Sequence, residues 1–321
     1  MAKRRLTDQQ RCRIAHKQRT LLDEPLGTEQ EGLVIAHFGR QLSIEDENGA
    51  IFRCFSRQNL GSLVTGDSVL FQPHLTQTGT GLILARQPRH SVLVRPDPYK
   101  QQRDIVANID QLLLVIAIEP EPITYYIDQY LMVAQIIGIP CHLVINKNDL
   151  PTTPAIKTIY ELYQSIGYTV LSTSAERESG LDELTAILSR QNSILVGQSG
   201  VGKSTLLNQL VPNAQAKQGE ISSANQKGKH TTTTAQLYHL PHGGNLIDSP
   251  GVREFGIWHI AEAERARGFV EFLPKLGHCR FRDCNHLDAP GCAIRAAVDQ
   301  GEISSQRYQN YQRLMAQAKH G

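Results

Sequence analysis

The chain has 321 residues, of which 40% are hydrophobic and 20% charged, with a formal net charge of +2. This length is sufficient for two or three domains with cores of their own, and the composition is typical of a globular protein rather than a disordered or fibrous one. No apolar run approaches the ~20 residues that span a bilayer, and no apolar stretch follows the basic N-terminus. We therefore expect no membrane contact, a cytoplasmic location and a monomer.

The first 20 residues carry seven Lys or Arg and a single acid, Asp8. A basic, glutamine-rich arm of this kind is either a solvated tail or an arm that binds phosphate groups. An organelle transit peptide is a third interpretation, which the weak apolar face of the segment disfavours. We assign residues 1–30 to this arm.

Residues 31–95 contain short apolar segments separated by turn-forming residues. Strands are predicted at residues 32–38, 42–45, 51–55, 68–71, 82–86 and 91–94. Five or six short strands at this spacing indicate a small β-barrel, for which an OB-fold is the commonest candidate. Such barrels either bind nucleic acid or dock other proteins, and the sequence favours neither.

From residue 104 the pattern changes to strands that alternate with helices. The predicted strands are residues 112–118, 141–145, 168–171, 193–196 and 245–247, and the predicted helices are residues 127–137, 154–166 and 181–189. This alternation predicts a doubly wound α/β domain over residues 104–259. Residues 260–321 are expected to form a mostly helical domain that contains a Cys/His loop.

A phosphate-binding loop lies between a predicted strand and a predicted helix. It matches the P-loop pattern in full, with Gly197, Gln198, Ser199, Gly200, Val201, Gly202, Lys203, Ser204 and Thr205. The glycines let backbone N–H groups turn toward phosphate oxygens, and the helix N-terminus adds favourable charge. Lys203 is the expected catalytic cation at the β- and γ-phosphates, and the Ser204 hydroxyl is an expected Mg²⁺ ligand.

Two further loops follow predicted strands and predict selection of guanine. An Asn-Lys-Asn-Asp run begins at Asn146 and ends at Asp149. The Asp149 carboxylate can accept hydrogen bonds from guanine N1–H and the 2-amino group, Asn146 can address the O6/N7 edge, and the Lys147 stem can cover the base. Ser174 and Ala175 resemble the loop whose backbone closes on guanine O6. A polar capping turn is the alternative interpretation of the first run.

The γ-phosphate and its magnesium ion are expected to contact two switch segments. Asp248 begins a D-x-P-G run that ends at Gly251, and this Asp would hold Mg²⁺ through water while the Gly amide contacts the γ-phosphate. The polar span 219–235 is typical of a switch segment that changes with the nucleotide. Either Thr231 or Thr232 is the Mg²⁺-coordinating threonine of this span, and Thr232 is favoured.

A cysteine and histidine cluster near the C-terminus predicts one structural zinc ion. Cys279, Cys284, His286 and Cys292 offer three thiolates and one imidazole within fourteen residues, a closed tetrahedral set. His278 is an alternative to His286, although the Cys-x-His spacing favours the latter. Reduced core cysteines beside an incidental histidine are the other interpretation.

The nucleotide motifs are circularly permuted: the base-binding loop precedes the P-loop, whereas ordinary GTPases begin with the P-loop. Because all these loops lie at one edge of one sheet, rejoining the chain elsewhere preserves the site. Residues 228–233 read Gly-Lys-His-Thr-Thr-Thr, and residues 248–256 read Asp-Ser-Pro-Gly-Val-Arg-Glu-Phe-Gly. With the barrel, the motif order and the Cys₃His segment, residues 30–300 resemble the RsgA (YjeQ) family.

This resemblance implies a GTPase that depends on the small ribosomal subunit and acts late in its maturation. It implies an OB-fold N-domain, a central GTPase domain and a zinc domain, with the outer two contacting rRNA. GTP or GDP with Mg²⁺ and one Zn²⁺ are the expected ligands. A GTP-gated binding module for another RNA or protein, with incidental hydrolysis, is the alternative. A small-molecule phosphotransferase is a third class, which the base-binding loop disfavours.

The residue that orients the attacking water differs from the usual one. Many GTPases carry a Gln directly after the D-x-x-G motif, and here that position is Val252, which cannot hydrogen-bond through its side chain. Either the ribosome supplies the group or a switch residue does. His230 is the only imidazole in the span 219–235, and we predict that it orients the water or accepts its proton. A solvated loop residue is the alternative.

Overall fold

The computed structural model describes residues 25–38, 41–56, 60–96, 102–212, 214, 235–249 and 260–317. It divides the chain into two compact units, Met1–Arg89 and His90–Gly321, which are described separately below. Among the described helices, none has the length and apolar character needed to cross a membrane.

The first unit is a closed five-stranded barrel. Its strands are β1 (Gln30–Phe38), β2 (Gln41–Asp46), β3 (Ile51–Ser56), β4 (Ser68–Pro73) and β5 (Thr80–Arg86). They follow the order β1-β2-β3-β5-β4, and β4 pairs back onto β1, with only β3 and β5 parallel. Alternate apolar side chains point inward, and Val34, Ile44, Phe71 and Ile83 are fully buried there. The OB-fold prediction is confirmed.

A separate hairpin begins the second unit. It pairs β6 (Val92–Pro96) antiparallel with β7 (Gln102–Ala107). The segment predicted at residues 91–94 is therefore a strand, but it does not belong to the barrel sheet. Strand β7 was not predicted, because its Gln-Arg-Asp start lacks the apolar alternation of a strand.

The central sheet of the second unit has six strands in the order β10-β9-β8-β11-β13-β12. The strands are β8 (Gln111–Ala117), β9 (Cys141–Asn146), β10 (Val170–Ser172), β11 (Asn192–Val196), β12 (Gln236–His239) and β13 (Asn245–Asp248). All are parallel except β12. Every residue of β8 is buried, as expected of a strand covered on both faces. The doubly wound α/β prediction is confirmed.

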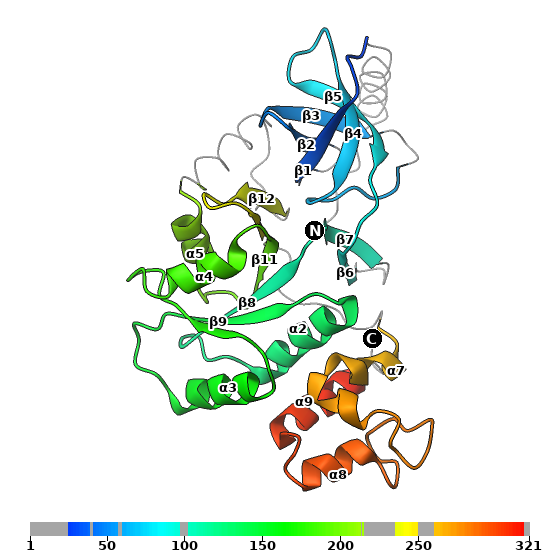
Figure 1. Ribbon diagram of the computed structural model, residues 1–321, viewed down its shortest axis with the longest axis vertical. Helices are drawn as coiled ribbons and strands as arrows, with labels where there is room; N and C mark the ends of the chain where they lie inside the picture. Colours follow the sequence, from blue (N-terminus) through cyan, green and yellow to red (C-terminus); the bar gives the residue numbers. More distant parts are fainter. Residues whose placement is uncertain are drawn as a thin grey trace, which may run out of the picture. The chain divides into compact units, whose positions relative to one another are not determined.

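Helices cover both faces of this sheet, with α2 (Thr124–Ile137) and α3 (Pro154–Ser165) on one side and α4 (Leu181–Leu188) and α5 (Lys203–Leu210) on the other (Figure 1). Helix α3 begins where the Thr153 hydroxyl accepts a hydrogen bond from the Ile156 N–H (3.3 Å), with Pro154 in the first turn. Helix α2 ends at Gly138, whose left-handed conformation closes its last turn. The start of α3 therefore lies at the carboxyl edge of the sheet, after β9, and the end of α2 lies at the opposite edge, before β9.

The C-terminal part is helical and packs against α2. It comprises α7 (Glu262–Arg265), the 3₁₀ turns η1 (Ala266–Gly268) and η2 (Val270–Lys275), α8 (Ala293–Asp299) and α9 (Ser305–Gln317). Its core is a group of aromatic rings, in which Phe269, Phe272 and Tyr311 lie with centroids 4.8 to 5.5 Å apart. The mostly helical prediction for this segment is confirmed, and its cysteine and histidine loop lies between η2 and α8.

Candidate nucleotide and metal sites

The base-binding loop and the P-loop are directly hydrogen-bonded to each other. Asn146, the last residue of β9, is 1% exposed and donates from its side-chain nitrogen to the Val201 carbonyl (2.9 Å). Gly202 permits this contact, because a Cβ there would lie 2.3 Å from the Asn146 amide nitrogen. The Asn146 side chain therefore holds the P-loop next to the base-binding loop.

Lys147 makes a second connection between these loops. Its backbone adopts a left-handed conformation (φ 63°), which is uncommon outside glycine and is concentrated at functional sites. Its ammonium group donates to the Gly200 carbonyl (2.8 Å) and to the Glu119 carbonyl (2.7 Å). The lysine thus connects the P-loop with the β8–α2 loop, a contact that no sequence motif signalled.

Asp149 and the loop after β10 form the remaining part of the base-binding side. The Ser174 hydroxyl donates to one Asp149 carboxylate oxygen (2.6 Å), and this bond lowers the pKa of Asp149. The Ala175 N–H lies 3.4 Å from the Asn146 side-chain oxygen, and the Ala175 carbonyl accepts from Gln209 of α5 (3.0 Å). An ionised carboxylate is therefore held beside a closing loop that α5 also supports.

The P-loop follows β11 and leads into α5. Gly197 is required at its start, because a Cβ there would lie 2.1 Å from the Val115 carbonyl oxygen. Lys203 folds over the loop and donates to the carbonyls of Gly197 (2.7 Å) and Gln198 (2.6 Å). The hydroxyl residues Ser204 and Thr205 are exposed at the first turn of the helix.

Asp248 ends β13, the strand next to β11, and pairs with Leu195 in the parallel register. Burial raises the pKa of Asp248, and the nearby Lys203 charge opposes that shift. The Asp248 carboxylate at the end of β13 therefore lies close enough to the Lys203 ammonium group, at the start of α5, for their charges to interact. Of the remaining predicted residues, the catalytic candidate His230 lies outside the described residues, as do Thr231, Thr232 and Gly251.

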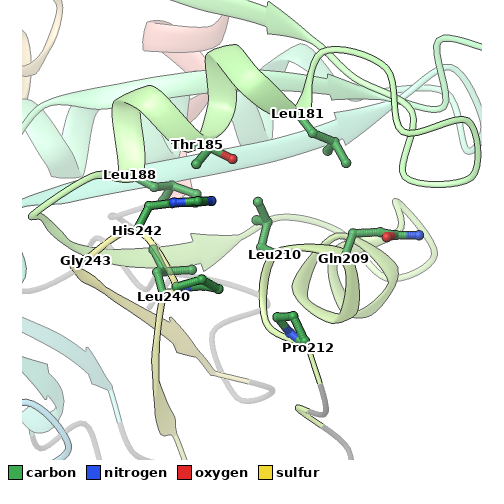
Figure 2. Close-up of a pocket in the computed structure, with 10 residues that line it drawn as sticks. Leu181, Thr185, Leu188, Gln209, Leu210, Pro212, Leu240, His242 and Gly243 are labelled. Atoms are coloured by element: carbon green, nitrogen blue, oxygen red, sulfur yellow. The ribbon is translucent and has the colours of Figure 1, made fainter.

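An apolar hollow of about 320 Å³ lies between α4, α5 and the turn before β13 (Figure 2). Four leucines line it, together with Pro212, Pro241 and His242, and no Lys or Arg is among the described residues of the lining. A triphosphate is normally bound by cationic side chains, which the described lining does not offer. The hollow is therefore distinct from the loops that carry the nucleotide motifs.

The four predicted metal ligands converge in one place. The ligand atoms of Cys279, Cys284, His286 and Cys292 all lie within 4.8 Å of one another. The sulfurs of Cys279 and Cys292 are 4.0 Å apart, and the His286 Nδ1 lies 3.5 and 3.7 Å from them. Tetrahedral zinc with bonds of about 2.3 Å to sulfur and about 2.0 Å to nitrogen requires ligand–ligand distances of about 3.5 to 3.8 Å. The donor set fits such an ion.

A second layer of hydrogen bonds holds the ligand loop. The Ala293 N–H points to the Cys279 sulfur (3.4 Å), which suits a thiolate. The Tyr308 hydroxyl donates to the His286 carbonyl (2.9 Å), and the Tyr311 hydroxyl donates to the Asn285 carbonyl (3.1 Å). Helix α9 therefore supports the metal-ligand loop. These tyrosines were not predicted, because they lie more than 20 residues along the chain from their partners.

Comparison with known proteins agrees with this geometry. The model of the RsgA GTPase family matches residues 86–258. The small ribosomal subunit biogenesis GTPase RsgA of Hahella chejuensis is 47% identical, over 98% of this chain and 96% of that protein. The chain belongs to the RsgA family of GTPases. Its reaction is therefore the hydrolysis of GTP to GDP and phosphate.

Further similar proteins match more than nine-tenths of the chain. The protein of the same name from Chromohalobacter salexigens is 48% identical, over 98% of both chains. The crystal structure of YjeQ from Thermotoga maritima superposes with a TM-score of 0.73 at 34% identity, covering 91% of this chain and 99% of that one. YloQ, a circularly permuted GTPase, gives 0.70 at 26% identity, covering 91% and 96%.

Proposed function

We propose that GTP binds along the carboxyl edge of the central sheet and that its hydrolysis serves the maturation of the small ribosomal subunit. The observation that carries the first part is the direct contact between loops. Asn146 and Lys147 donate to the carbonyls of Val201 and Gly200. A nucleotide can span both loops, with its base at the base-binding loop and its phosphates at the P-loop.

The motifs, together with the contacts of the described loops, support the following roles for the individual residues. Asp149 would accept from the guanine N1–H and 2-amino groups, and Ala175 would offer its N–H to O6. The P-loop amides and Lys203 would bind the phosphates, with Ser204 and Asp248 holding Mg²⁺ directly and through water. Thr231, Thr232 and Gly251 complete the proposed set, with Thr232 as the magnesium ligand. His230 is the proposed catalytic residue that orients the attacking water.

We further infer that the ion in the Cys₃His cluster is zinc and that its role is structural. Four donor atoms within 4.8 Å of one another would complete a tetrahedral shell, which would leave no position for water or substrate. When bound, the ion supplies the cross-links that hold residues 279–292 as one loop. The proposed division is a basic arm at residues 1–30, an OB-fold domain at 31–95, whose barrel strands end at Arg86, a GTPase domain at 104–259 and a zinc domain at 260–321.

The ribosomal role rests on the names of the relatives, which are small ribosomal subunit biogenesis GTPases. The test is the rate of GTP hydrolysis with purified small subunits, compared with an equal mass of protein-free rRNA. We expect small subunits to accelerate hydrolysis well beyond the free rRNA. Equal rates in both arms would favour the alternative, a GTP-gated module for another RNA or protein. We propose that the protein acts in the cytoplasm as a monomer.

A further inference from the structure

The most exposed Phe or Tyr ring among the described residues lies within the proposed zinc loop. Phe281 is 44% exposed, and it is the only Phe or Tyr in the exposed class among the residues that the structure describes. Single exposed apolar side chains are common on protein surfaces, so this ring is informative only together with the charged groups beside it.

Two arginines flank this ring. The guanidinium carbon of Arg280 lies 5.5 Å from the centre of the Phe281 ring, within the range of a cation–π contact. Arg280 and Arg282 are both exposed, and neither forms an ion pair with another described residue. Their charges are therefore available to an anionic partner.

The backbone holds these three side chains in a short, fixed loop. Cys279 and Cys284 bracket the loop, and both belong to the cluster whose ligand atoms lie within 4.8 Å of one another. The Arg280 N–H donates to the Gly291 carbonyl (3.0 Å), which ties the loop to the far end of the ligand segment. Such anchoring reduces the entropy that the loop loses when it binds a partner.

We propose that Arg280, Phe281 and Arg282 form a contact for single-stranded RNA. An unpaired base stacks on the Phe281 ring, and the two guanidinium groups bind the phosphates on either side. An acidic peptide would use the charges but would leave the ring without a role, whereas RNA uses both features. The proposal deepens the ribosomal role and rests on it for the RNA that is bound in the cell.

The test measures binding of the full chain to a fluorescein-labelled 12-nucleotide single-stranded RNA by anisotropy, over a series of salt concentrations. Phe281→Ala should weaken binding between about fivefold and a hundredfold, with the salt dependence unchanged. Phe281→Tyr keeps a ring and should bind as the wild type does. Arg280→Ala and Arg282→Ala should each lower the slope of log K against log salt by about 0.7.

Two matched variants control for charge alone. Arg295→Ala removes one positive charge from an exposed position on α8, outside the loop, and should change the affinity by less than twofold. Asp283→Asn removes the acid next to Arg282 and should strengthen binding. One zinc per chain in every variant, measured by elemental analysis, shows that the loop is still formed.

The proposal is overturned if Phe281→Ala and Arg280→Ala keep zinc and bind the RNA as the wild type does. It is also overturned if a 12-residue polyglutamate peptide binds and the RNA does not. Stimulation of GTP hydrolysis by small subunits is measured in parallel on the wild type. Absence of stimulation contradicts the ribosomal role, whereas normal stimulation with unaffected variants contradicts only the loop contact.

Discussion

Arg307 of α9 donates a hydrogen bond to Asp128 of α2, and these side chains are only 1% and 0% exposed although they lie 179 residues apart in the chain. Arg307 also forms a double hydrogen bond with Glu271, at 2.6 and 2.9 Å. Asp128 accepts further bonds from Tyr163 (2.5 Å) and Asn310 (2.6 Å). A fully hydrogen-bonded ionic cluster thus joins the C-terminal helices to the GTPase core.

Removing the cation from this cluster should be strongly destabilising. Arg307→Met leaves the carboxylates of Asp128 and Glu271 buried without a positive partner, which costs about 3 to 5 kcal/mol. The expected result is a lower urea midpoint, followed by circular dichroism. Arg313→Ala on the exposed face of the same helix is the control, with an expected change within about 0.5 kcal/mol. Equal midpoints for the two variants would contradict the structural role of the cluster.

Most of the strands and helices could be predicted from local patterns, whereas the contacts between distant segments could not. The apolar run at β8 and the turn-bounded strands of the barrel carry periodicities that indicate their structure. Strand β12 was missed because its four residues, Gln236–His239, are too few for a period to show. Asp128 was missed for another reason: a charged residue in a helix normally faces solvent, and its partner Arg307 is remote in sequence.

In the candidate site, too, local motifs could be predicted from the sequence and contacts between distant segments could not. Motifs identified the loops, because phosphate and base recognition require fixed residue types at fixed spacing. They did not indicate that the Lys147 side chain would donate to the Glu119 carbonyl, since the acceptor is a backbone oxygen that any residue offers. They also gave no sign of the Gln209 contact to Ala175. The roles of His230 and the switch threonines stay predictions.

Loss of one metal ligand should release the metal without abolishing nucleotide binding. Cys284→Ser removes one of four zinc donors, and the loop that Tyr308 and Tyr311 hold should then loosen. The P-loop domain has its own buried core, so GTP affinity should change by less than about threefold. Elemental analysis and nucleotide titration measure the two effects. A full complement of zinc in this variant would contradict the ligand assignment.

Guanine selection is expected to reside in Asp149. In Asp149→Asn the amide oxygen can keep the hydrogen bond from Ser174, which turns the amide nitrogen toward the base. That donor then faces the guanine donors, so GTP affinity should fall by about a hundredfold or more. Xanthosine triphosphate, with an oxygen at position 2, should gain affinity. Competition between the two nucleotides measures the change, and unaltered selectivity would rule out this role.

His230 is expected to act on the attacking water. His230→Ala should bind GTP and small subunits as the wild type does, because the base and phosphate loops are untouched. Stimulated hydrolysis should fall by about 10² to 10⁴, the contribution of a well-placed acid–base group. Single-turnover hydrolysis with saturating small subunits is the measurement. Full stimulated turnover by the variant would instead assign the water-orienting group to the ribosome.

A half-buried histidine near the amino end of β9 should make stability depend on pH. The His142 Nε2 lies 3.1 Å from the side-chain oxygen of Gln111. Gln111 uses its nitrogen to donate to Ser193 (2.8 Å) and to the Ile187 carbonyl (2.9 Å), so its oxygen faces His142 and the Nε2 must carry the proton. The His142 Nδ1 is buried and meets no hydrogen-bond partner in the described structure.

Protonating His142 would place an unpaired N–H in this buried position, and burial accordingly lowers its pKa from the usual 6.5. In the unfolded chain this histidine binds a proton near pH 6.5, whereas in the folded chain it binds one only at a lower pH. The free energy of unfolding should therefore decrease as the pH falls below about 6.5. His142→Gln has no titratable ring and should reduce this decrease. Urea denaturation at pH 7.5 and 5.5 measures the effect as the difference between wild type and variant. Equal decreases in both proteins would show that His142 does not contribute to it.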